Sequence, residues 1–134
     1  MRRTGFMGLL ALGVVALTVQ TALAGSPHLV GKLTISQSGS TITVSGKEAG
    51  LGNEATVHIV FSADALCVNG GGNHPKAVNK TSVGAGDDFP VQNGQALFSL
   101  QATATFQPPC DPPMSVVFAN ITLTDVGNGV QLYP

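Results

Sequence analysis

The sequence predicts an all-β protein in which two sheets pack face to face and one disulfide joins two loops. Three observations favour this class. Apolar residues recur at every second position along most of the chain, glycine-containing turn signals interrupt them at short intervals, and the 134 residues include only two cysteines. No window places apolar residues at helical spacing over three turns, so we expect no helix.

The first 24 residues have the pattern of a secretory signal peptide. Arg2 and Arg3 precede an almost wholly apolar run over residues 6–19, and Ala22-Leu23-Ala24 forms a small-residue cleavage pattern. The apolar run is shorter than the ~20 residues that anchor a helix in a bilayer. We therefore expect a single secreted domain over residues 25–134, extracellular or periplasmic, with no membrane attachment after processing.

The first half of this domain contains three runs in which apolar and polar residues alternate. Ser38-Gly39-Ser40 separates the first two runs, which predicts a β-hairpin. The apolar members of the three runs are Leu33 and Ile35, Ile42 and Val44, and Val57, Ile59 and Phe61.

The second half contains two longer alternating runs. Asn93-Gly94 is a strong hairpin signal, because both central positions of a type I′ turn require positive φ, and Asn128-Gly129 is a second candidate. The polar faces of the runs carry Thr, Ser, Asn and Gln, which is typical of a half-buried sheet. Their expected apolar faces are Ala96, Phe98, Leu100, Ala102, Ala104 and Phe106, and Val117, Ala119, Ile121 and Leu123.

Seven or eight strands, with a turn every 8–12 residues, are typical of a two-sheet Greek-key sandwich of the immunoglobulin-like kind. The chain contains no Trp, whereas true immunoglobulin domains place one between their two cysteines, so this likeness is one of architecture. A small β-barrel is the alternative fold.

The two cysteines, Cys67 and Cys110, predict a disulfide because an exported protein meets an oxidising compartment. Cys67 opens a glycine-rich loop, and Cys110 lies in a proline-rich connection over residues 107–113. The disulfide is expected to join these loops at one end of the sandwich, where irregular backbone on a rigid scaffold favours binding. The candidate binding loop consists of Asn69, Gly70, Gly71, Gly72, Asn73, His74 and Pro75.

Composition excludes several classes of function. Without the signal peptide, four lysines and no arginine stand against seven acidic residues, so no nucleic acid or anionic lipid is expected as a partner. The sequence contains no Gly-x-Ser-x-Gly, no free Cys with a His and no His-Glu-x-x-His. We therefore expect no catalytic residues, no enzyme activity and no cofactor.

Metal binding has only weak candidates, namely His74, Asp87 and Asp88. The three histidines of the chain are widely spaced, and the two aspartates follow Gly84-Ala85-Gly86 without matching a calcium-loop pattern. We expect Asp87 and Asp88 to occupy a solvated hairpin turn rather than to bind a metal.

At the glycine-rich loop the chain resembles a group of small exported bacterial proteins, many of them actinobacterial. Those proteins share a Cys-x-Asn-x-Gly-Gly-Asn-x-Pro segment, matched here from Cys67 to Pro75, and a second cysteine before the last long strand. The resemblance covers residues 55–126 and implies export, a disulfide and a β fold. The group has no established activity.

Together these observations predict a secreted, non-enzymatic binding or cell-envelope interaction module, monomeric, whose partner is a protein or envelope component. The alternative is a small extracellular or periplasmic metal or ligand carrier that uses His74, Asp87 or Asp88.

Overall fold

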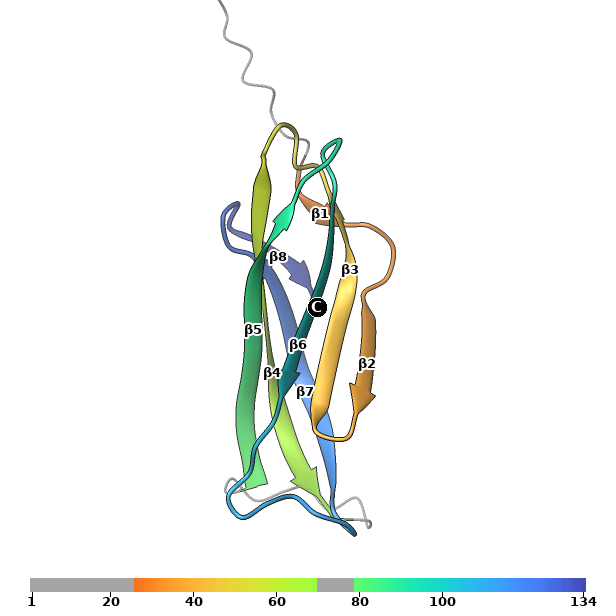
Figure 1. The fold of residues 1–134 in the computed structure, drawn as a ribbon, viewed down its shortest axis with the longest axis vertical. Helices are drawn as coiled ribbons and strands as arrows, with labels where there is room; N and C mark the ends of the chain where they lie inside the picture. The colour runs from red at the N-terminus through yellow and green to blue at the C-terminus, as the bar shows by residue number, and fades with distance from the viewer. Residues whose placement is uncertain (1–25, 70–78) are drawn as a thin grey trace, which may run out of the picture.

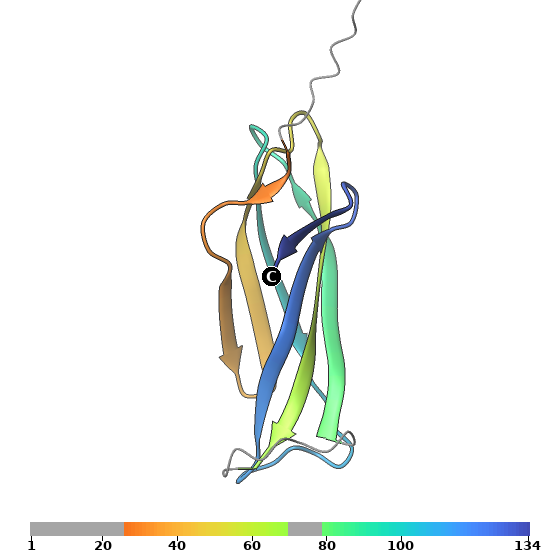
Figure 2. The same cartoon turned by 180° about the vertical axis from the view of Figure 1, so that it is seen from behind.

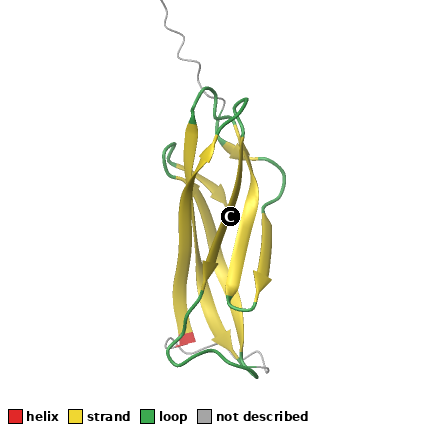
Figure 3. Cartoon of the chain, viewed as in Figure 1, coloured by secondary structure: helices red, strands yellow, loops and turns green. Residues whose placement is uncertain are grey.

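The computed structural model describes residues 26–69 and 79–134 as two packed antiparallel sheets (Figure 1). The expected signal peptide and residues 70–75 of the candidate binding loop lie outside the described residues. Strands dominate the described part of the chain (Figure 3), which confirms the all-β class.

The first sheet is built around β3 (Thr41–Ala49). The short β1 (His28–Leu29) and β2 (Thr34–Ser38) pair with opposite halves of β3, and β6 (Ala96–Thr103) also pairs with β3. Every pairing in this sheet is antiparallel.

The second sheet has the order β5-β4-β7-β8, again antiparallel throughout. Its strands are β4 (Thr56–Val68), β5 (Lys80–Pro90), β7 (Ser115–Asp125) and β8 (Val130–Tyr133). Figure 2 shows β7 and β8 from behind, with the other sheet beyond them. The small barrel does not form among the described residues, because no pairing joins β5 to β6 and the isolated Gln92–Gln95 bridge lies in the turn between them.

The core lies between the sheets and follows the predicted alternation. The expected apolar faces of β3, β4 and β6 all point inward, because a strand with one buried face repeats every two residues. Burial of this apolar area is the main source of stability. The largest fully buried apolar side chains are Ile42, Val44, Leu51, Ile59, Phe61 and Leu123.

The predicted hairpins also form. Asn93 and Gly94 have φ of 53° and 74°, and Gln92 and Gln95 bond to each other on either side of them. Two residues, Gly39 and Ser40, connect β2 to β3, and the turn that contains Asn128 and Gly129 connects β7 to β8.

Strand β7 departs from the prediction because it contains a bulge at Asn120. Where the register between β4 and β7 shifts, β4 contains one unpaired residue, Ala63, but β7 contains two. One of these two is Asn120, which has a φ of 52°. Because of the extra residue, the β7 residues that precede the bulge point to the opposite face of the sheet from the one predicted. Val116 and Phe118 therefore face the core, and Val117, expected on the apolar face, is 43% exposed.

The aspartates expected in a hairpin turn lie instead within β5. Asp87 pairs with Ile59 and Asp88 with His58 on β4, so the expected turn is wrong. The register is continuous from Lys80 to Pro90 because Gly84 and Gly86 extend the strand where their neighbours on β4 leave little room. A Cβ at Gly84 would lie 2.8 Å from the carbonyl oxygen of Phe61.

The predicted disulfide is confirmed, with the Cα atoms of Cys67 and Cys110 5.8 Å apart. Cys67 is the penultimate residue of β4 rather than the first residue of a loop. The bridge therefore ties the end of a core strand to the connection between β6 and β7.

Replacing Cys67 with Ser should lower the melting temperature by roughly 10 °C or more. A bridge between residues 43 apart in sequence contributes roughly 4 kcal/mol by restricting the unfolded chain. Differential scanning calorimetry of Cys67→Ser and Cys110→Ser would check this. An unchanged melting curve in both variants would contradict it.

At the bulge, Asn120→Ala should be less stable than Asn120→Gly by about 1 kcal/mol. Both variants lose the Asn120 side chain, but only Ala is penalised at a φ of 52°. Urea denaturation of the two variants measures the difference directly. Equal stabilities would show that the backbone at residue 120 does not need the left-handed conformation.

Candidate functional site

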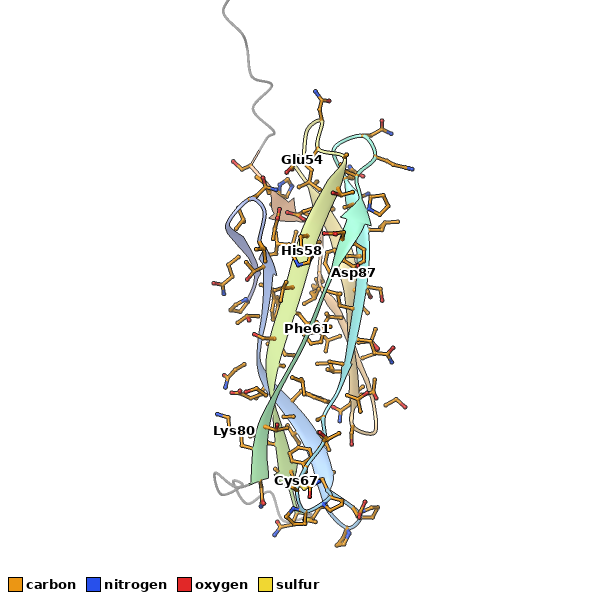
Figure 4. The ribbon with its side chains drawn as sticks, turned by 60° about the vertical axis from the view of Figure 1, so that its left-hand side comes forward. Glu54, His58, Phe61, Cys67, Lys80 and Asp87 are labelled. Atoms are coloured by element: carbon orange, nitrogen blue, oxygen red, sulfur yellow. A yellow bond between two sulfur atoms is a disulfide. The ribbon has the colours of Figure 1, made fainter. Side chains whose placement is uncertain are left out.

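The end of the sandwich that carries Cys67 and Cys110, here called the disulfide end, contains a groove of about 490 Å³. Figure 4 shows Cys67 there, with Glu54 at the opposite end of the molecule. The β2–β3 hairpin forms one wall, and the chain leading into β7 forms the other. Among the described residues, the lining carries no charged side chain and consists of Gln37, Gly39, Ser40, Cys110, Pro112, Met114, Ser115 and Val116.

The Gln37 side chain holds the two walls together. Its Nε2 donates to the carbonyl oxygen of Gly39 at 2.9 Å and to that of Val116, in the other sheet, at 2.7 Å. Both amide protons are thereby used, so the Gln37 carbonyl oxygen is the group left to accept from a ligand.

Two sulfur-containing residues, Cys110 and Met114, line the same groove. The Met114 Sδ lies 3.8 Å from the Cys67 Sγ, and the Met114 amide donates to the carbonyl oxygen of Asp111 at 2.9 Å. Met114 therefore lies in a backbone turn that begins at Asp111, next to Cys110, and its sulfur lies close to the disulfide. A polarizable, uncharged lining of this kind favours the binding of apolar and uncharged polar groups of a ligand.

The candidate binding loop starts at this end. Asn69 follows the last residue of β4, and the rest of the loop, including His74, lies outside the described residues. The structure therefore locates where the loop leaves the sandwich, directly beside the groove lined by Cys110 and Met114.

Asp87 and Asp88, proposed above as weak metal ligands, point to different faces of β5. Asp87 lies opposite the buried Ile59, on the core-facing side of the sheet, whereas Asp88 lies opposite His58 on the outer face. Asp88 Oδ1 forms a hydrogen bond with His58 Nδ1 at 2.8 Å, and both side chains are exposed. An exposed pair of this kind contributes little to stability.

The outer face of the second sheet carries a polar network at the bulge. Asn120 Nδ2 donates to Asp64 Oδ2 at 2.8 Å, and the Lys80 ammonium lies 3.2 Å from the same oxygen. These two donors hold the pKa of Asp64 below its ordinary value. Because the bulge turns Asn120 outward, the left-handed backbone serves to aim this amide at Asp64.

At the end opposite the disulfide, two carboxyl groups are fully buried. Glu48 on β3 and Asp125 at the end of β7 are both 0% exposed. Asp125 accepts from the Asn128 amide nitrogen at 3.1 Å and from its Nδ2 at 2.6 Å. Neither oxygen of Glu48 has a donor within reach, so Glu48 is satisfied when it carries a proton and donates it to Asp125.

The pKa of Glu48 is raised from 4.5 to about 8. Burial is the main cause, followed by the hydrogen bond with Asp125 and the negative charges of Asp125 and Glu54. The sequence analysis did not identify this pair. Extending the apolar face of β3 by two positions beyond Gly46 would have placed Glu48 among the inward-facing residues.

Within residues 26–69 and 79–134, no three His, Cys, Asp or Glu side chains form a group that could hold a metal ion. In the same residues, no helix is long and apolar enough to cross a membrane. A second groove, of about 370 Å³, lies beside the Asn93-Gly94 hairpin and includes Lys47 and the 74% exposed Leu97.

Comparisons with protein-family models, with curated proteins and with solved structures find no match to this chain.

The buried carboxyl pair predicts that stability falls as the pH rises. Because the folded-state pKa of Glu48 lies above its ordinary value, its contribution is complete below pH 4.5 and is lost as the pH rises through 8. The free energy of unfolding should fall by up to about 1.4 kcal/mol per pH unit within that window. Urea denaturation between pH 5 and pH 9 measures this slope.

Glu48→Gln should largely remove the slope, because the amide does not titrate. Asp111→Asn, a change of an exposed carboxylate near the disulfide, should keep it. A wild-type slope in Glu48→Gln would mean that other groups cause the pH dependence.

Proposed function

We propose that this protein is a secreted, non-enzymatic binding module, acting outside the cell or at the cell envelope, that binds its partner at the disulfide end. The observation that carries the proposal is the uncharged groove between Gln37 and Met114, built where the disulfide ties the end of β4 to the connection between β6 and β7. A groove fixed on a rigid scaffold loses little conformational freedom on binding.

The chemistry of the groove favours an uncharged surface as the partner. Its walls offer one free amide oxygen, at Gln37, and the exposed hydroxyl of Ser115, beside Pro112 and Met114. The candidate binding loop begins at Asn69, at the same end of the sandwich. These features suit a segment of a protein or an envelope component.

The disulfide supports a location in an oxidising compartment, and the N-terminal pattern and the resemblance to exported bacterial proteins support secretion. We also propose that the sandwich is of the immunoglobulin-like kind. The chain passes between its sheets after β3, β5 and β6, so that strands distant in sequence pair within each sheet. Such folds commonly bind through loops at one end.

The test is capture of the partner from an envelope extract of the host, with the mature protein immobilised. Wild type should enrich one specific component, and Ser115→Arg should reduce the captured amount about tenfold or more, since a bulky charge enters the uncharged groove. The captured component is identified by mass spectrometry.

Ser99→Arg is the matched control, because Ser99 is also an exposed strand serine but lies on β6, in the first sheet. This variant should capture as wild type does. Enrichment of nothing specific by wild type, or equal capture by Ser115→Arg, would contradict the proposal.

A further inference from the structure

Strand β5 leaves a long edge of the second sheet without a partner. It pairs only with β4 among the described residues, so alternate backbone N–H and C=O groups from Lys80 to Pro90 have no strand on their other side. Unpaired edges of this length are templates for another strand. At the opposite edge of the same sheet, the four-residue β8 pairs only with residues 123–125 of β7.

The middle of β5 lacks the features that usually protect an edge. Residues 81–86 include no charge, no proline and no bulge. Gly84 and Gly86 present no side chain on the outer face, so an approaching backbone meets no obstacle there. Charges occur only toward the ends of the strand, at Lys80 and at Asp87 and Asp88, as Figure 4 shows for Lys80 and Asp87.

These charges are arranged to complement a second copy of the same strand. Lys80 and Asp88 both point to the outer face, opposite Leu66 and His58 of β4, and Gly84 lies midway between them. An antiparallel copy related by a two-fold axis through Gly84 therefore places Lys80 opposite the partner subunit's Asp88, twice by symmetry. Directly opposed side chains of opposite charge stabilise a strand pair.

Only this register brings opposite charges together on the outer face. Outer-face residues must oppose outer-face residues to keep the pleat continuous, so the alternatives are shifts of the axis to other positions. Moving the axis to Val83 places Lys80 opposite the partner's Gly86, and moving it to Ala85 places Lys80 opposite the partner's Pro90. Neither arrangement pairs a charge.

We propose that the protein forms a two-fold symmetric dimer in which β5 pairs with β5 of a second copy about Gly84, joining the two second sheets into one continuous sheet. On the core-facing side, the same register opposes Val83 to the partner's Ala85 and Thr81 to the partner's Asp87. Both contacts are compatible with burial, since one is apolar and the other joins a hydroxyl to a carboxylate.

The existing contacts of the two charges favour this arrangement. Asp64 holds the Lys80 ammonium on the outer face at 3.2 Å, and His58 holds Asp88 at 2.8 Å. Each charged group is therefore positioned on the correct face before pairing. An ammonium carries three donors, so Lys80 can bond Asp64 and the partner's Asp88 together.

The test is sedimentation equilibrium of the mature protein with its disulfide intact. Wild type should show a concentration-dependent dimer. Lys80→Glu and Asp88→Lys should each weaken dimerisation about tenfold or more, because each sets like charges opposite one another twice. The double variant Lys80→Glu/Asp88→Lys restores opposite charges in the same register and should return dimerisation close to wild type.

Lys47→Glu is the control, because it makes the same change of net charge on β3, in the other sheet. It should dimerise as wild type does, and thermal melting of every variant verifies folding. A wild-type monomer at all concentrations, or a double variant no better than the single ones, would overturn the proposal.

Discussion

Strand β4 alternates core-facing and outward side chains without interruption from Thr56 to Val68, and both of its neighbours are set in register against it. Its inward residues, with Phe61 at the centre, contribute one side of the core along the whole length of the sandwich. One end of β4 carries Cys67, and near the other the His58 carbonyl oxygen accepts from the Val126 amide at the start of the β7–β8 turn. Because a slip of one residue would turn all these side chains outward, β4 fixes the second sheet and, through the core, its position on the first.

Most of the fold could be predicted from the sequence, because it follows from the local alternation of apolar and polar residues and from turn residues. Alternation predicted the buried faces of β3, β4 and β6, and the Asn93-Gly94 signal predicted a turn that the structure confirms with positive φ at both residues. The disulfide could be predicted because the chain has only two cysteines. Each of these predictions needs only neighbouring residues or a count, and none depends on how the sheets pack.

Features that depend on tertiary contacts could not be predicted. The bulge at Asn120 exists only in relation to β4, and the hairpin expected at Asp87 gave way to a strand because β4 offers a partner along its full length. For the candidate site, the sequence predicted binding at the disulfide end but did not predict the contribution of Gln37, which reaches the groove from the other sheet. Glu48 was missed because a carboxyl at a core-facing position is acceptable only beside a group such as Asp125 that can share its proton.

The two ends of the sandwich are stabilised by different interactions, one sensitive to reductant and the other to pH. A reductant acts on the Cys67–Cys110 bridge at one end, whereas alkali acts on the proton between Glu48 and Asp125 at the other. Strands β4 and β7 run between these ends, so loosening one end leaves their register held at the other. The surrounding medium therefore selects the end from which the sandwich frays first, and acidic, oxidising surroundings keep both ends closed.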